Sequence, residues 1–115
     1  MDELIAQIST NTGLDPAVAG RAVGIILKFL LQEGPQEKVQ ALIDSLPGAA
    51  EAVAAAPEIG GGGVMGVFNT LTAAGLGMGD IQGATQEFVS FAKSKIGADE
   101  VDDIIGTIPG LNQFV

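Results

Sequence analysis

The segment from Asp15 to Gln32 constrains the fold of this chain more than any other, because almost all of its circumference is apolar. Its aliphatic side chains recur at helical spacing, and further apolar residues fill the sides of that stripe. Asp15 and Pro16 are typical of a helix start, and Gly34-Pro35 is typical of a helix end. A helix that is apolar on most sides is buried on most sides. The rest of the chain must therefore pack around this segment.

Two glycines inside this segment, Gly20 and Gly24, lie one helical turn apart. Because neither has a side chain, they leave a flat strip on the surface of the helix. We expect this strip to let a second helix pack closely, rather than to bind a ligand.

Shorter helices are predicted before and after the long apolar segment. Residues 1–12 and 35–46 carry one-sided apolar stripes, and residues 49–56 are rich in alanine. The dipeptides Gly13-Leu14 and Pro47-Gly48 separate these segments. No part of the chain alternates apolar and polar residues over the length of a strand, so we expect no β-sheet.

The second half of the chain repeats the pattern of turns and apolar residues seen in the first half. A shift of 62 positions gives ten identical residues, without gaps, between residues 5–53 and 67–115. The matches include both Pro-Gly turns, Pro47-Gly48 and Pro109-Gly110. The first helix fits better one residue out of this register, where its apolar set, Leu4, Ile5 and Ile8, aligns with Val67, Phe68 and Leu71.

We therefore predict an all-α fold of six or seven helices, in two similar three-helix halves packed about a pseudo-twofold axis. The chain has 115 residues, enough for one core, so we place a single helical domain over residues 1–115. Its internal repeats span residues 4–53 and 67–115. Between them, residues 57–66 include four successive glycines, Gly60 to Gly63, and are predicted to form a linker.

The charge of the chain limits its partners. It has 14 acidic and 5 basic side chains, a formal net charge of -9. We expect no nucleic-acid binding, because that binding depends on neutralising phosphates, whereas a homodimer or a protein partner with a basic surface is compatible with this charge. The apolar run of residues 22–31 is too short to cross a membrane and contains Lys28. No basic segment precedes an apolar stretch after Met1, so we expect a cytoplasmic protein without a membrane span or a signal peptide.

The chain contains no Cys and no His. This excludes disulfides, thiolate nucleophiles, Cys/His zinc sites and any catalysis that depends on an imidazole. We predict that the protein is not an enzyme and that it has no catalytic residue, cofactor or metal site.

Residues 61–66 formally match the dinucleotide-binding pattern G-x-G-x-x-G. That pattern holds a phosphate where a strand precedes it and a βαβ unit surrounds it. Here an alanine-rich segment with Pro57 precedes the glycines, and no second strand is predicted after them. We interpret Gly60–Gly63 as a connector without a catalytic role.

The densest group of carboxylates is formed by Asp99, Glu100, Asp102 and Asp103. The first two fall in the first turn of a predicted helix, where the helix dipole stabilises negative charge. The other two are expected to face solvent, because the apolar stripe around Val101 takes the inner side of that helix. Their spacing does not match a calcium-binding loop, so we favour a solvated acidic face over a metal site.

Arg21, the only arginine, lies on the polar side of the long apolar helix. We expect it at the surface, paired with a carboxylate such as Asp15 or Glu87. An anion site at Arg21 is the less favoured interpretation.

Four short motifs of the chain are similar to those of a known family. They are Gly13-Leu14-Asp15-Pro16, Ala19-Gly20-Arg21-Ala22-Val23-Gly24, Leu46-Pro47-Gly48-Ala49 and Gly75-Leu76. With these motifs, most of the chain resembles the bacterial VcgC/VcgE-like family of unknown function. The resemblance implies a small helical protein without an assigned activity, in a family that includes exported members. It brings no catalytic or binding residues with it.

Two functions fit these features. We expect a non-enzymatic interaction or structural module, because the chain is apolar and has few groups that could do chemistry. Its contact surface would include Met65, Phe68, Met78 and Phe114-Val115. The alternative is a binder of a small apolar ligand, in a cavity between the helical halves where alanine- and glycine-rich faces meet.

Overall fold

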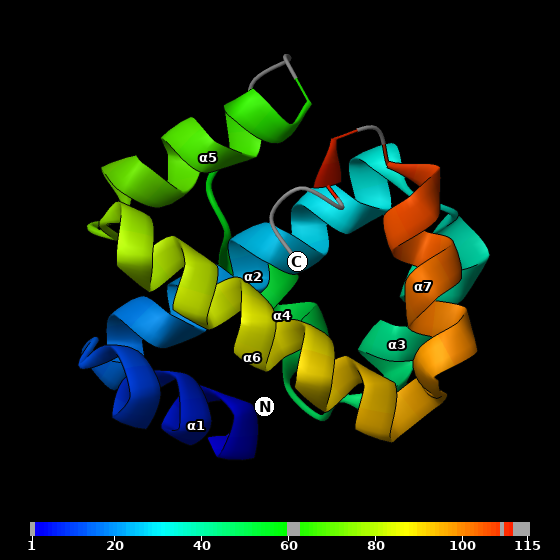
Figure 1. Cartoon of the computed structure of the whole chain (residues 1–115), viewed down its shortest axis with the longest axis horizontal. Coiled ribbons are helices and arrows are strands. Elements are labelled where there is room, and N and C mark those ends of the chain that lie inside the picture. Colours follow the sequence, from blue (N-terminus) through cyan, green and yellow to red (C-terminus); the bar gives the residue numbers. More distant parts are fainter. Residues whose placement is uncertain (1, 60–62, 109, 112–115) are drawn as a thin grey trace.

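The computed structural model describes residues 2–59, 63–108 and 110–111. Within these ranges the regular elements are α-helices, apart from one residue of 3-10 helix, so the predicted all-α class is confirmed (Figure 1). The helices are α1 (Asp2–Thr12), α2 (Pro16–Glu33), α3 (Gln36–Ser45), α4 (Ala49–Ala55), α5 (Val64–Ala73), α6 (Met78–Ile96) and α7 (Ala98–Thr107). Met1 and the end of the chain, with Phe114 and Val115, lie outside the described residues.

Helix α2 is the centre of the fold, as its apolar circumference predicts. It packs against α1, α3, α4, α5 and α6, and its middle, from Ala22 to Leu27, is buried without a break. Asp15 is the N-cap residue, as predicted, but its side chain makes no capping hydrogen bond. Pro16 and the apolar contacts of the helix therefore define this start without help from the Asp15 carboxylate.

The helix boundaries have the spacing that the predicted repeat requires. Helices α1, α2 and α3 begin at residues 2, 16 and 36, and α5, α6 and α7 begin at residues 64, 78 and 98, so each pair is 62 residues apart. The one-residue shift of the first helix is also present, because Leu4 and Ile8 are buried in α1 as Val67 and Leu71 are in α5.

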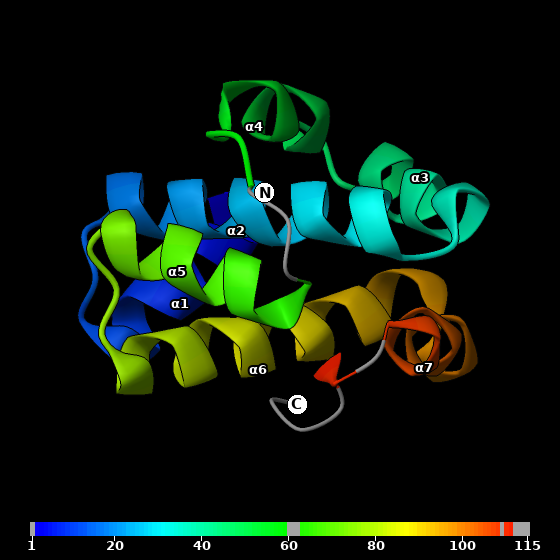
Figure 2. The same cartoon turned by 90° about the horizontal axis from the view of Figure 1, so that it is seen from above.

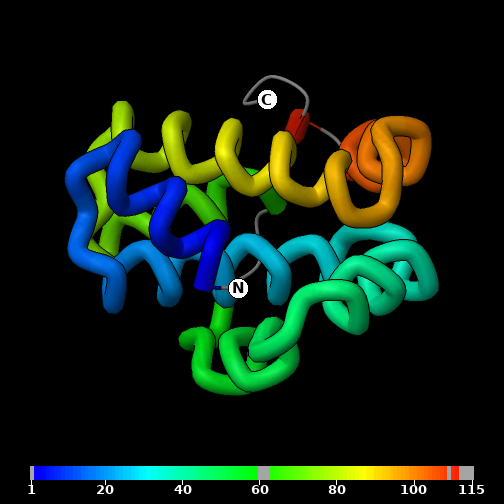
Figure 3. The backbone as a smooth tube through the Cα atoms, turned by 90° about the horizontal axis from the view of Figure 1, so that it is seen from below, coloured from blue at the N-terminus to red at the C-terminus, as the bar shows by residue number. Residues whose placement is uncertain are grey.

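The first helix of each half packs against the long helix of the other half. Helix α1 packs against α6, and α5 packs against α2, while the long helices α2 and α6 also contact each other. Figure 2 shows α2 with α3 in one layer and α6 with α7 in the next; Figure 3 shows α1 on the opposite side of the two long helices from α5. These two contacts between the halves differ in extent, because α1 contacts α6 more extensively than α5 contacts α2. The pseudo-twofold axis stays a prediction.

The two glycines of α2 are covered by different neighbours, and both make the expected flat strip. A Cβ built on Gly24 would lie 2.4 Å from the carbonyl oxygen of Ala52 in α4. A Cβ on Gly20 would meet only the end of the Ile5 side chain of α1, at 3.3 Å. Helix α4 therefore lies so close to α2 that Gly24 has no room for a side chain, and it covers the outer face of α2 (Figure 2).

The predicted linker of residues 57–66 extends too far toward the C-terminus. Helix α5 begins at Val64, and Gly66 is a buried residue of its first turns. A glycine inside a helix costs about 1 kcal/mol relative to alanine, and the burial of Val67 and Leu71 in the same helix offsets that cost. Gly60–Gly62 lie outside the described residues, and Gly63 has a φ of 59°, in the left-handed region that favours glycine.

Candidate functional site

An apolar crevice lies where the second half of the chain meets α2. It holds about 680 Å³ of space between its lining atoms, part of which is open to solvent. Helices α2, α3, α5, α6 and α7 all contribute to its walls. The lining residues are Ile26, Phe29, Leu30, Leu42, Val64, Val67, Phe68, Leu71, Ile81, Thr85, Phe88, Val89, Ala92, Val101, Ile104, Ile105 and Leu111.

The crevice forms because bulky side chains keep these helices apart. Phe29 of α2 and Phe88 of α6 stand in its walls, and branched residues of α5 and α7 close it at the sides. Five of the lining residues are partly exposed and form its rim: Val64, Phe68, Val89, Ile105 and Leu111. The alanine- and glycine-rich face of α2 lies elsewhere, under α4. Bulky side chains, and not small ones, therefore line most of this crevice, while Gly24 of α2 lets α4 approach closely.

The free space inside the crevice is narrow. The free cavity volume inside it is about 50 Å³. A dry apolar cavity that binds benzene in another protein measures about 150 Å³. A ligand of that size therefore fits only if a wall moves. Helix α5 packs mainly on α2 and α6, and these contacts are less extensive than those of the other wall helices, so α5 is the wall that moves most easily.

Thr85 is the one polar residue among the lining residues. It lies in the middle of α6 and is 8% exposed. Its hydroxyl has no hydrogen-bond partner among the described residues, and it is not wholly shut off from solvent. A hydroxyl in such a place loses hydrogen bonds to bulk water and gains none from the protein. The crevice therefore combines an apolar wall with one open hydrogen-bonding group.

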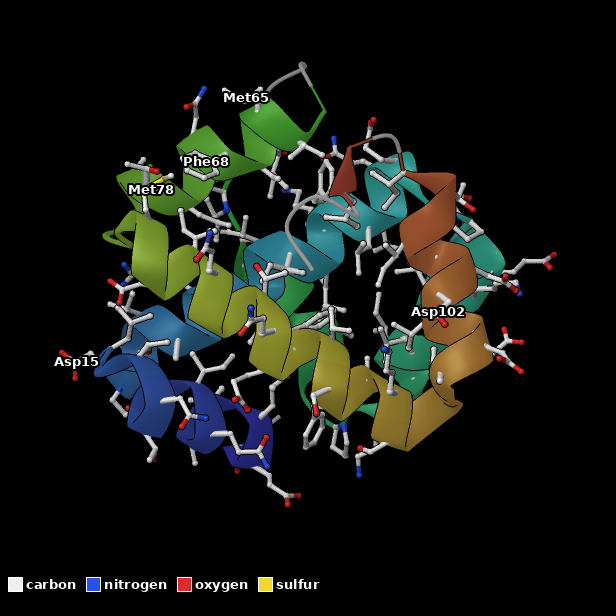
Figure 4. All side chains as sticks on the ribbon, in the orientation of Figure 1. Asp15, Met65, Phe68, Met78 and Asp102 are labelled. Atoms are coloured by element: carbon white, nitrogen blue, oxygen red, sulfur yellow. The ribbon has the colours of Figure 1, made fainter. Side chains whose placement is uncertain are left out.

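The carboxylates of α7 make ion pairs with lysines of other helices. Lys38 of α3 places its Nζ 2.7 Å from Asp103 Oδ2 and 3.2 Å from Glu100 Oε2. Asp102 Oδ1 lies 3.9 Å from Nζ of Lys93 in α6. Asp102 and Asp103 are exposed, as predicted, and Figure 4 shows Asp102 on α7, far from Asp15. Among the described residues, no group of three or more acidic side chains is placed to hold a metal ion.

The pairing has an electrostatic effect on Lys38. Hydrogen bonds to Asp103 and then to Glu100 raise the pKa of Lys38 above its ordinary value of 10.5. Because Lys38 belongs to α3 and both carboxylates to α7, the contact joins equivalent helices of the two halves. It is a surface contact, away from the crevice.

The remaining predicted candidates do not form a second site. Arg21 is exposed and makes no ion pair among the described residues, and Glu87 instead accepts a hydrogen bond from Asn11 Nδ2 at 2.7 Å. Of the G-x-G-x-x-G stretch, residues 64–66 form the first turn of α5, and Gly61 and Gly62 lie outside the described residues. No strand precedes the stretch within the residues that the structure describes.

The predicted contact surface divides into two kinds of residue. Met65 and Met78 are 63% and 66% exposed, and they are the exposed large hydrophobic residues of the described chain. Phe68 is partly buried and belongs to the crevice. In Figure 4 the three residues lie along α5 and the start of α6.

The crevice has no direct signal in the amino-acid sequence. Thr85 reads as an ordinary small polar residue among the buried positions of α6, between Ile81 and Phe88. The only available hint is that it interrupts an apolar stripe at a position where the repeat has Val23 in α2. Helix α3 adds Leu42 to the wall, although it belongs to the other half of the repeat.

No protein-family model, no curated protein and no solved structure matches this chain. The resemblance to the VcgC/VcgE-like family therefore stays a prediction. Among the described helices, none combines the length and apolar character that crossing a membrane requires.

Proposed function

We propose that this protein binds a small apolar ligand in the crevice between its two helical halves. The observation that supports the proposal is the lining itself, which contains 16 hydrophobic residues and one threonine. Ligand sites are typically concave and mostly apolar, with a few polar groups that fix orientation. A core without a ligand role is filled to crystal-like density, so an apolar opening that reaches the surface calls for an occupant.

The arrangement of the walls suggests how a ligand enters. The partly exposed residues of the rim surround the opening, and α5 carries Val64 and Phe68 on one side of it. An outward shift of α5 would enlarge the space without disturbing the contact of α1 with α6. Binding of this kind selects a more open state of the protein, so affinity depends on how often α5 moves.

An interaction module is the other function that the residues favour. Met65 and Met78 are large, flexible and exposed, which is common on surfaces that bind proteins. Two separate methionines are a small surface compared with the roughly 800 Å² that each partner buries in a stable complex. Sedimentation equilibrium tests this function: a monomer at micromolar concentration argues against the homodimer.

Titration with N-phenyl-1-naphthylamine, an uncharged fluorophore that brightens in apolar surroundings, tests the proposed function. We expect saturable binding by the full chain and a loss of it in Ala92→Leu, because Ala92 lines the crevice and the added carbons occupy its space. Ala41→Leu, at an exposed position of α3, is the matched control and should bind like the original chain.

Two results would contradict the proposal. One is the absence of saturable binding together with the absence of bound mass in native mass spectrometry of protein purified from its own host. The other is binding by a chain that ends at Leu111 but not by the full chain. That outcome would mean that residues 112–115 occupy the crevice themselves.

A further inference from the structure

We propose that the ligand is an uncharged aliphatic molecule with one hydroxyl or carbonyl group, and that this group hydrogen-bonds to Thr85 Oγ1. The inference rests on the proposed function, because it names the class of ligand that the same crevice takes. It adds a polar anchor to a site that is otherwise defined by shape alone.

The first support is the unusual state of the Thr85 hydroxyl. Threonines in helices often donate a hydrogen bond to the carbonyl oxygen four residues earlier. Thr12, Thr70, Thr72 and Thr107 all do so in this protein, at 2.6, 2.9, 3.0 and 2.8 Å. Thr85 and Thr10 do not, but Thr10 is exposed, whereas Thr85 is the most buried threonine of the described chain. Its hydroxyl is therefore free to bind a group inside the crevice.

The second support is the number of polar groups in the site. Thr85 is the single polar lining residue, so one hydrogen-bonding group of a ligand is satisfied there and a second one is not. A buried polar group without a partner costs free energy, which selects against sugars, nucleosides and other ligands with many polar groups. The fitting ligand has one polar group on an apolar body.

The third support is the absence of charge in the lining of the crevice. None of its lining residues is ionisable. Lys93, a basic residue of the same helix, is exposed and faces Asp102 instead. A carboxylate or phosphate in the crevice would have no counter-ion, and the whole chain, with a net charge of -9, repels anions. An alcohol or an ester fits where a fatty acid anion does not.

Calorimetric titration with a matched set of probes that share an eight-carbon chain tests this inference. The probes are 1-octanol, methyl octanoate, n-octyl chloride and sodium octanoate at pH 7, each titrated into the full chain. We expect 1-octanol and methyl octanoate to bind more tightly than the chloride, and octanoate to bind most weakly. The hydroxyl of Thr85 can donate to the ester carbonyl and can donate to or accept from the alcohol.

Variants at position 85 separate the hydrogen bond from the shape of the site. Thr85→Val removes the hydroxyl but keeps the volume, and we expect it to weaken 1-octanol about fivefold while leaving the chloride unchanged, as one neutral hydrogen bond predicts. Thr85→Ser keeps the hydroxyl and should retain the preference for the alcohol. Thr10→Val, at an exposed position of α1 where the hydroxyl makes no hydrogen bond among the described residues, is the control.

The outcomes distinguish this inference from the proposed function. If none of the four probes binds, the proposed function fails together with the inference. If the chloride binds as well as 1-octanol, and Thr85→Val changes neither, the crevice is a ligand site but Thr85 is not its anchor. Tighter binding of octanoate than of 1-octanol would also overturn the inference, because it requires a positive group that the lining lacks.

Discussion

Single positions in this protein are constrained in ways that their residue types do not reveal. Gly24 and Gly20 are one turn apart in the same helix, yet only Gly24 faces a backbone atom of another helix. Thr85 and Thr70 are both helical, yet only Thr70 has a partner for its hydroxyl. In both pairs the tertiary neighbour, and not the sequence, decides which of two similar residues is sensitive to substitution.

Gly24→Ala should lower the free energy of unfolding by about 1–3 kcal/mol, because the new methyl group overlaps the carbonyl oxygen of Ala52 and α4 must shift. Gly20→Ala should be neutral or stabilising, since the tip of the Ile5 side chain can move and alanine favours the helix by about 1 kcal/mol. Urea denaturation of the two variants checks this. Equal effects of the two substitutions would show that α4 does not approach α2 closely at Gly24.

Thr85→Val should raise the free energy of unfolding of the ligand-free protein by about 1 kcal/mol, because it replaces a largely buried hydroxyl, which has no protein partner among the described residues, with a methyl group. The same substitution at Thr70 should lower stability slightly, since Thr70 Oγ1 donates to the Gly66 carbonyl at 2.9 Å. Thermal and urea unfolding measure both. A clear loss of stability in Thr85→Val would mean that its hydroxyl is paired in the folded protein.

At the scale of the helices, the sequence predicts boundaries well and contacts poorly. The starts of α2 and α3 follow from local signals, such as Pro16 and Gly34-Pro35. The predicted linker ends too late, because four glycines suggest a break, whereas the burial of Val67 favours a helix that already begins at Val64. The crevice could not be predicted, since it forms only where α2 and α3 of the first half meet α5, α6 and α7 of the second half.

The contact between α3 and α7 should depend on pH in one direction. Asp103 and Glu100 raise the pKa of Lys38, so the charged form is favoured in the folded state. The stabilisation is fully present below the unfolded pKa of about 10.5 and is lost as the pH rises through the higher folded pKa. We expect the stability difference between the original chain and Lys38→Met to be constant from pH 7 to pH 9 and to shrink above pH 11. Arg21→Met, at an exposed arginine that makes no ion pair among the described residues, is the control. A difference that grows with pH would contradict the ion pair.

At the scale of the whole molecule, the two halves depend on each other. The first helix of each half packs against the long helix of the other half, so neither half buries its apolar faces alone. The repeat of 62 residues made the sequence of helices predictable, but it does not explain why the halves pack unequally. That inequality leaves the crevice on the α5 side, where the second half meets α2.

Isolated halves should therefore not fold. A fragment of residues 1–59 lacks α5 and α6, which cover α2, and a chain of about 60 residues is marginal even with a complete core. We expect a broad, uncooperative thermal transition for this fragment and for residues 63–115, by circular dichroism. Mixing the two fragments should restore a cooperative transition. A fragment that unfolds cooperatively on its own would show that the halves are independent domains.

The most direct test of the crevice as a binding site is a methyl NMR titration of the full chain with 1-octanol. We expect saturable shifts of the methyl groups of Leu71, Val89 and Ile104, which line the crevice, with one dissociation constant. The methyl groups of Ile5 and Val53, which pack elsewhere on the core, should stay in place. Shifts that are unsaturable, or that are as large at Ile5 and Val53 as in the crevice, would contradict the account.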